Sequence, residues 1–97
     1  MLDEIVNTLK THENALKSRG VLHASVFGST ARGTRTESSD IDIVIDLDTA
    51  RPMNVFDYAA IKDEIKAIVG ESADVVTREG LKKPLRERVE KEAVDAF

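Results

Sequence analysis

The sequence has no cysteine among its 97 residues, and this absence excludes disulfide bonds and thiolate metal sites. It also lacks any apolar run that approaches the ~20 residues of a membrane-spanning helix or the roughly 7–15 residues of a signal-peptide core. Internal repeats, low-complexity segments and linker-like stretches are absent from the sequence as well. Together these absences predict a cytoplasmic protein with no membrane segment and one small domain, residues 1–97.

Positive charge is scarce relative to negative charge, with 14 Lys and Arg against 18 Asp and Glu and a net charge of −4. Binding to nucleic acid through many phosphates needs a basic surface, so this balance argues against direct nucleic-acid binding and favours a basic protein partner. A length of 97 residues allows one core but not a catalytic domain together with a separate substrate-binding domain.

Histidine is also rare, since only His12 and His23 are present and they do not have the spacing of a metal site. We expect both to be surface or packing residues. No Ser-His-Asp arrangement is evident either, so the sequence offers no obvious protein nucleophile.

The most informative stretch runs from Val26 to Asp48 and reads VFGSTARGTRTESSDIDIVIDLD. It predicts a strand that ends at Phe27, a small-residue turn, a loop rich in Thr, Ser, Arg and Gly, and a second strand that opens at Asp40. Strand side chains alternate between two faces, so one face of the second strand is apolar and the other is acidic. The apolar face contains Ile41, Ile43, Ile45 and Leu47, and the other contains Asp40, Asp42, Val44, Asp46 and Asp48.

Asp40 and Asp42 are candidate metal ligands. Residues two apart on a strand are separated by roughly 6.6 Å, so their carboxylates can converge on metal ions about 3.5–4 Å apart, the spacing of two-metal phosphoryl-transfer sites. Two adjacent like charges need a cation or solvent to screen them, and Mg²⁺ with its preference for oxygen ligands fits best.

Gly28 and Ser29 are candidate phosphate-binding residues. Glycine permits a close approach of the backbone to a ligand, and a serine at the start of a short helix offers its hydroxyl beside free backbone N–H groups. One half of the predicted site therefore suits metal and the other half suits phosphate.

The pattern Gly28-Ser29, ten residues, Asp40-x-Asp42 resembles the signature of the DNA polymerase β-like nucleotidyltransferase superfamily. The fuller text GSTARG…SDIDIVID is similar to its minimal members, the MNT proteins, as are residues 73–79 and 88–94. The resemblance implies a third metal-binding carboxylate on the next strand, which corresponds to Asp74. It also implies that Arg32 contacts phosphate, whereas we expect Arg35 to be solvated.

The resemblance implies nucleotidyl transfer with ATP as substrate and one or two Mg²⁺ ions, with two expected. Asp40, Asp42 and Asp74 would be the catalytic and metal-binding residues, while Gly28, Ser29 and Arg32 would hold the nucleotide. MNT proteins further imply an antitoxin that transfers AMP to a tyrosine hydroxyl of a HEPN-domain ribonuclease toxin.

Three alternatives remain open from the sequence. A non-catalytic antitoxin with the same fold would block the toxin by binding alone. Transfer to a small-molecule hydroxyl occurs in relatives that generally carry an additional helical domain. The plainest alternative is structural: a hairpin-like loop followed by an edge strand whose aspartates are solvated.

The complete pattern predicts helices over residues 2–18, 54–70 and 81–97, a short helix after Gly28, and strands over residues 21–27, 40–48 and 72–76. This order is an α/β sandwich on a small mixed sheet, which is also the polymerase β-like nucleotidyltransferase fold that the resemblance implies. In the first strand we expect Leu22, Ala24 and Val26 to share a face. We expect Asp46 and Asp48 to be solvated.

Overall fold

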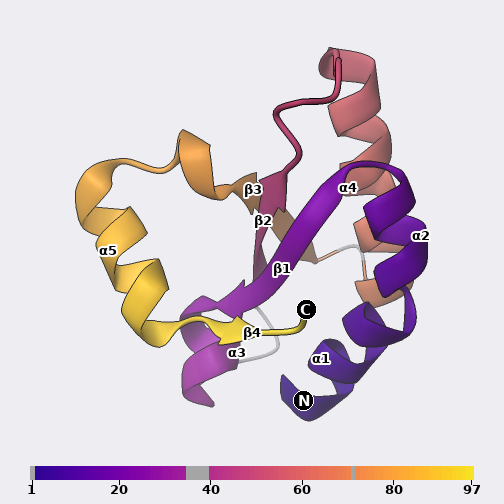
Figure 1. Ribbon diagram of the computed structural model, residues 1–97. Helices are drawn as coiled ribbons and strands as arrows, with labels where there is room; N and C mark the ends of the chain where they lie inside the picture. Colours follow the sequence, from indigo (N-terminus) through magenta and orange to yellow (C-terminus); the bar gives the residue numbers. More distant parts are fainter. Residues whose placement is uncertain (1, 35–39, 71) are drawn as a thin grey trace.

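The computed structural model describes residues 2–34, 40–70 and 72–97 of the chain (Figure 1). Its helices are α1 (Leu2–Thr11), α2 (Glu13–Ser18), α3 (Gly28–Arg32), α4 (Val55–Val69), the 3₁₀ turn η1 (Arg78–Gly80) and α5 (Lys83–Glu92). Its strands are β1 (Val21–Phe27), β2 (Ile41–Leu47), β3 (Ala73–Thr77) and β4 (Val94–Asp95).

The strands form one mixed sheet in the order β3-β2-β1-β4. β1 is antiparallel to both β2 and β4, whereas β2 and β3 are parallel. Parallel neighbours need a long crossover, and α4 provides it. The predicted α/β fold with a small mixed sheet is therefore confirmed.

One face of the sheet carries the main core. The isoleucines of β2 are buried there as the alternation predicted, and α1, α2 and α4 cover them (Figure 1). The opposite, acidic face is also partly covered, because Val44 in its middle is buried. Val89 of α5 is buried too, and α5 lies on that side of the sheet in Figure 1.

The prediction that Leu22 shares a face of β1 with Ala24 and Val26 is wrong. The β1–β2 register slips between Val21 and His23, which leaves Leu22 in a bulge. Val21 and Ala24 consequently face the core, while Leu22 is 44% exposed. The hydrophobic pattern alone did not indicate the extra residue.

The first helix is not continuous over residues 2–18 as predicted. It breaks at His12, whose N–H is shared between the carbonyls of Thr8 at 3.3 Å and Leu9 at 3.1 Å. Its imidazole Nδ1 also lies 2.8 Å from the Thr8 carbonyl oxygen. Helix α2 then begins at Glu13.

The predicted start of α4 is confirmed in detail. The Asn54 side chain accepts a hydrogen bond from the N–H of Asp57 at 2.9 Å, and the Asp57 carboxylate accepts one from the N–H of Asn54 at 3.1 Å. This reciprocal capping box fixes the point at which the helix begins.

The predicted helix over residues 81–97 is wrong at its C-terminal end. Helix α5 stops at Glu92, and the following residues extend to form β4 beside β1. The N–H of Ala96 bonds to the carbonyl of Ala24 at 2.8 Å. Pairing satisfies the backbone groups at the free edge of β1, and this gain outweighs one more helical turn.

None of the helices in the described part of the chain combines the length and the apolar character that crossing a membrane requires.

Candidate active site

Gly28 lies where β1 meets α3, and its backbone φ of 74° belongs to the left-handed region. A Cβ atom at this position would collide with the Asp42 carboxylate on β2. Glycine is thus required for two reasons: the positive φ disfavours other residues, and the Asp42 carboxylate leaves no room for a Cβ atom. The contact brings the predicted phosphate-binding turn directly against one of the predicted metal ligands.

Asp42 and Asp74 are partners in the parallel register of β2 and β3. Neighbouring strands lie about 4.8 Å apart, and paired residues point to the same face of the sheet. Burial raises the pKa of Asp42 above its ordinary value, and the negative charges of Asp74 and Asp40 raise it further. Arg32 acts in the opposite direction and lowers that pKa. Asp74, Asp40 and Arg32 are thus all close enough to influence the Asp42 carboxyl.

Arg32 ends α3 and is exposed, with its guanidinium Nη1 3.8 Å from the carboxylate of Glu92 on α5. An exposed pair at this distance contributes little stability. Arg32 is therefore free to turn toward an anion bound beside Asp42.

Ser29 lies in the first turn of α3, and its carbonyl accepts a hydrogen bond from the N–H of Thr34 at 2.9 Å. Asp40 is exposed and immediately precedes β2. Arg35 lies outside the described residues. The structure therefore gathers Gly28, Arg32, Asp40, Asp42 and Asp74 around one edge of the sheet and places Ser29 next to Gly28 in the chain.

Within the described ranges, no three Asp, Glu or His side chains stand in the arrangement of a metal-holding group. The donor set nevertheless suits a hard divalent cation: three carboxylates lie at one sheet edge, and two of them penalise the ionisation of the third. A cation between them would remove that repulsion. The assignment of Asp40, Asp42 and Asp74 as ligands stays a prediction.

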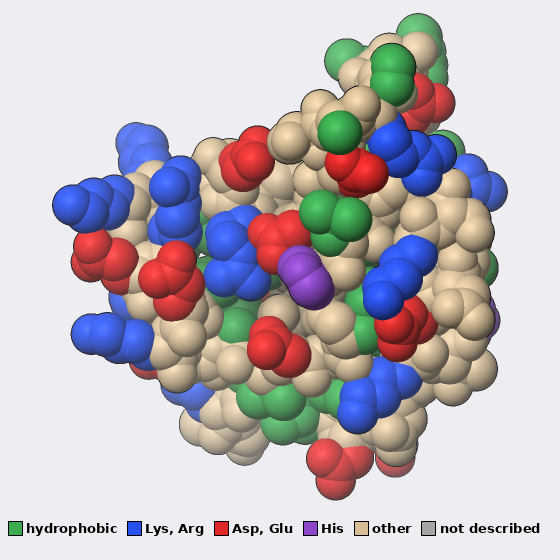
Figure 2. Space-filling model, in the orientation of Figure 1, with side chains coloured by type: hydrophobic (Ala, Val, Ile, Leu, Met, Phe, Trp, Pro, Cys, Tyr) green, Lys and Arg blue, Asp and Glu red, His purple; other side chains and the backbone are tan. Residues whose placement is uncertain are grey.

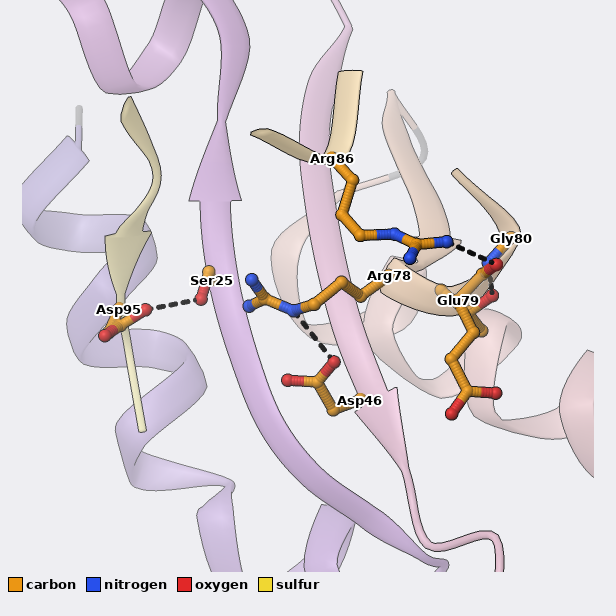
Figure 3. Close-up of polar contacts among 8 residues, drawn as sticks. Ser25, Asp46, Arg78, Glu79, Gly80, Arg86 and Asp95 are labelled. Carbon is orange, nitrogen blue, oxygen red and sulfur yellow. Dashed lines mark hydrogen bonds and ion pairs between the residues drawn. The ribbon is translucent and has the colours of Figure 1, made fainter. Parts of the chain in front are cut away.

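Asp46 is not the solvated residue that we expected. Its carboxylate pairs with the Arg78 guanidinium Nε at 2.9 Å (Figure 3), and both side chains are partly buried. The neighbouring Ser25 hydroxyl donates to the Asp95 carboxylate at 2.7 Å. These partners are 32 and 70 residues apart, so no local pattern indicates them. Asp48 accepts the N–H of Ala50 in a turn.

Tyr58 of α4 is a residue whose connection to the site the sequence did not show. It packs against the core, as its apolar stripe predicted. Burial and the charge of Asp74 raise the pKa of its phenol, so the tyrosine lies within electrostatic reach of the acidic edge. Only the packing of α4 against β3 could reveal this relation.

A mixed sheet with a glycine turn packed on paired aspartates defines a nucleotidyltransferase of the polymerase β-like fold, and the chain belongs to the nucleotidyltransferase domain family, whose model matches residues 9–96. Within this family it resembles the minimal nucleotidyltransferases. The protein adenylyltransferase MntA of Thermococcus cleftensis is 32% identical over 94 residues, which cover 96% of this chain and 93% of that protein.

Solved structures agree with this assignment. A protein described as a minimal nucleotidyltransferase matches with a TM-score of 0.70 and 33% identity, over 92% of this chain and 93% of its own. The crystal structure of a toxin-antitoxin with AMP-PNP matches with a TM-score of 0.67, over 91% of this chain and 72% of that chain. At 18% identity, this second likeness shows the fold alone.

Proposed function

We propose that the protein is the antitoxin of a toxin-antitoxin pair and transfers AMP from ATP to a tyrosine hydroxyl of a HEPN-domain ribonuclease toxin. The observation that carries the proposal is the contact between Gly28 and Asp42, together with the register that places Asp74 beside Asp42. A phosphate-binding turn and a set of carboxylates are the two halves that nucleotidyl transfer needs.

The protein groups have separate tasks in this reaction. Asp40, Asp42 and Asp74 would hold one or two Mg²⁺ ions. When bound, the metal supplies electrostatic stabilisation of the charge that develops on the α-phosphate and on the departing pyrophosphate. The backbone at Gly28, the hydroxyl and N–H of Ser29 and the guanidinium of Arg32 bind and orient the β- and γ-phosphates.

The chemical step exchanges one phosphorus–oxygen bond for another. The acceptor oxygen bonds to the α-phosphorus, the bond from the α-phosphorus to the bridging oxygen breaks, and pyrophosphate leaves in line. Asp74 aligns the acceptor hydroxyl and takes its proton. Positioning and electrostatics provide the acceleration, so no protein nucleophile is needed.

A protein acceptor is supported by three features. The similar MntA protein is named a protein adenylyltransferase, and a chain of the same fold occurs in a toxin-antitoxin structure with AMP-PNP. The net charge of −4 also suits a basic, RNA-cleaving partner.

The test is the intact mass of the partner HEPN-domain toxin after incubation with this chain, ATP and Mg²⁺. We expect the toxin to gain mass in whole adenylate units and to lose ribonuclease activity. An Asp40→Asn/Asp42→Asn double variant should produce no gain, because it keeps the side-chain size and removes the charge. Peptide mapping should then locate the adenylate on tyrosine.

Two results would contradict the proposal. A toxin of unchanged mass that is still inhibited in a stable complex would make this chain a binding-only antitoxin. Adenylation of a small-molecule hydroxyl in place of the toxin would assign a different acceptor class.

A further inference from the structure

The first turn of α4 exposes two large apolar side chains, with Val55 78% and Phe56 83% accessible to solvent. The other large hydrophobic residues that the described chain exposes, Leu22 at 44% and Leu85 at 37%, are about half as accessible and lie on different elements. Single exposed hydrophobic residues are ordinary, whereas an adjacent apolar pair beside a cavity is typical of an interaction site.

Such a cavity adjoins this pair. It has a volume of about 500 Å³ and lies at the ends of β2 and β3, and Val55 forms part of its wall. Leu47, Met53 and Tyr58 supply further apolar lining. We call Val55, Phe56 and these three residues the α4 apolar surface. In Figure 1 α4 starts at the top of the view, and hydrophobic side chains gather at that corner in Figure 2.

The rim of the cavity is predominantly acidic. Asp48 and Glu79 contribute two carboxylates, against the guanidinium of Arg51, while the third carboxylate of the lining, that of Asp46, is paired with Arg78. Arg51 is directed elsewhere, since its Nη1 donates to the carbonyl of Ser18 at 3.0 Å. Figure 3 shows the Glu79 carboxylate extending away from Arg86, whose guanidinium donates instead to the backbone carbonyls of Glu79 and Leu81.

Most of the α4 apolar surface lies at the opposite end of β2 from Asp42, and Tyr58 is its member within electrostatic reach of Asp74. Asp48, the residue that follows β2, is six positions beyond Asp42, which corresponds to about 20 Å of extended chain. A folded domain of ~100 residues has a radius of gyration of about 13 Å, so a protein seated at one end of β2 can reach the other end.

We propose that the α4 apolar surface is the docking site for the protein acceptor, and that the acceptor binds it through an apolar side chain flanked by Lys or Arg. The apolar side chain fills the cavity beside Phe56, while the basic residues face Asp48 and Glu79. A second copy of this chain fits less well, because a two-fold contact would bring these carboxylates close to their own equivalents. The inference rests on the proposed function, since it assumes a protein acceptor.

The test uses Phe56→Asp, with Leu85→Asp as the matched control. Both place a charge at an exposed apolar position, on α4 and on α5 respectively, and circular dichroism checks that each variant is folded. We expect Phe56→Asp to raise the KM for the HEPN toxin at least tenfold, with kcat at saturating toxin and the KM for ATP unchanged. Leu85→Asp should match the unsubstituted protein.

A second arm examines charge and separates docking from catalysis. Toxin affinity is measured in the Asp40→Asn/Asp42→Asn background, where no transfer takes place. Phe56→Asp should weaken binding there by at least tenfold, and Glu79→Lys should weaken it and reduce its dependence on salt. If the toxin binds through this surface but is never adenylated, the proposed function fails and the docking site stands.

The docking site is wrong if Phe56→Asp leaves toxin KM and affinity unchanged, or if Leu85→Asp weakens both equally. It is also wrong if sedimentation shows that Phe56→Asp converts a dimer into a monomer without any effect on the toxin. That result would assign the surface to self-association.

Discussion

At the scale of single residues, two glycines with nearly the same positive φ separate the cost of strain from the cost of a collision. Gly28 has φ 74° and Gly33 has φ 75°, but only a Cβ at Gly28 meets another side chain, that of Asp42. A non-glycine residue in the left-handed region costs roughly 1–2 kcal/mol. Gly33 therefore provides a control that carries the same strain.

We predict that Gly33→Ala reduces the free energy of unfolding by about 1 kcal/mol, from strain alone, and that Gly28→Ala reduces it by more, because the collision with Asp42 adds to the strain. Only Gly28→Ala should abolish most of the transfer activity, by about a hundredfold or more, because it displaces the Asp42 carboxylate. Chemical denaturation and initial rates of toxin adenylation measure the two effects. Equal activity in both variants would show that the contact with Asp42 is not needed for transfer.

The raised pKa of Asp42 predicts how the stability of the folded protein depends on pH. This pKa is raised above the ordinary 3.8 by burial and by Asp74 and Asp40, so the folded metal-free protein holds this proton more tightly than the unfolded chain does. Asp42 therefore adds stability below about pH 4, and this contribution is lost as pH rises through the raised native value. Asp42→Asn should increase the denaturation midpoint at pH 7 in EDTA, and the gain should shrink near pH 4.

Asp63→Asn on the exposed face of α4 is the control for this measurement, and its midpoint should follow that of the unsubstituted protein. A midpoint for Asp42→Asn below that of the unsubstituted protein at pH 7 would contradict the proposed repulsion. Mg²⁺ should remove the advantage of Asp42→Asn if the three carboxylates bind it.

At the scale of the elements, strong local patterns predicted the structure well and pairing between distant segments was missed. The Asn54 capping box and the alternation of β2 depend on neighbouring residues, so the sequence indicates them. The bulge at Leu22 and the strand β4 depend on how β1 pairs with two other strands. The Asp46–Arg78 pair likewise forms only once β2 and β3 lie side by side.

Asn54 supports a prediction at this scale, since its side chain accepts the N–H of Asp57 at the start of α4. Asn54→Ala should reduce the free energy of unfolding by about 1 kcal/mol, whereas Asn54→Ser retains a capping oxygen and should lose much less. Because Val55 and Phe56 follow directly, Asn54→Ala should also weaken toxin binding. Amide hydrogen exchange in the first turn of α4, compared between the two variants, tests whether the cap orders this surface.

At the scale of the whole molecule, the family and the mixed sheet followed from one motif and the order of elements. The spacing of Gly28-Ser29 and Asp40-x-Asp42 indicated that these residues meet, and the fold brings Gly28 against Asp42. The sequence could not predict the apolar surface at the far end of β2, because nothing in the helical pattern shows that Val55 and Phe56 are exposed. Their exposure is decided by the orientation of α4 on the sheet.

The central position of β2 has a further consequence if the acceptor docks at that far end. β2 is hydrogen-bonded on both sides, to β1 and to β3, so its length is rigid. β2 would then set a fixed distance of about 20 Å between the docking site and the site of AMP transfer. Tyrosines would be selected by their distance from the anchoring side chain, whatever sequence surrounds them.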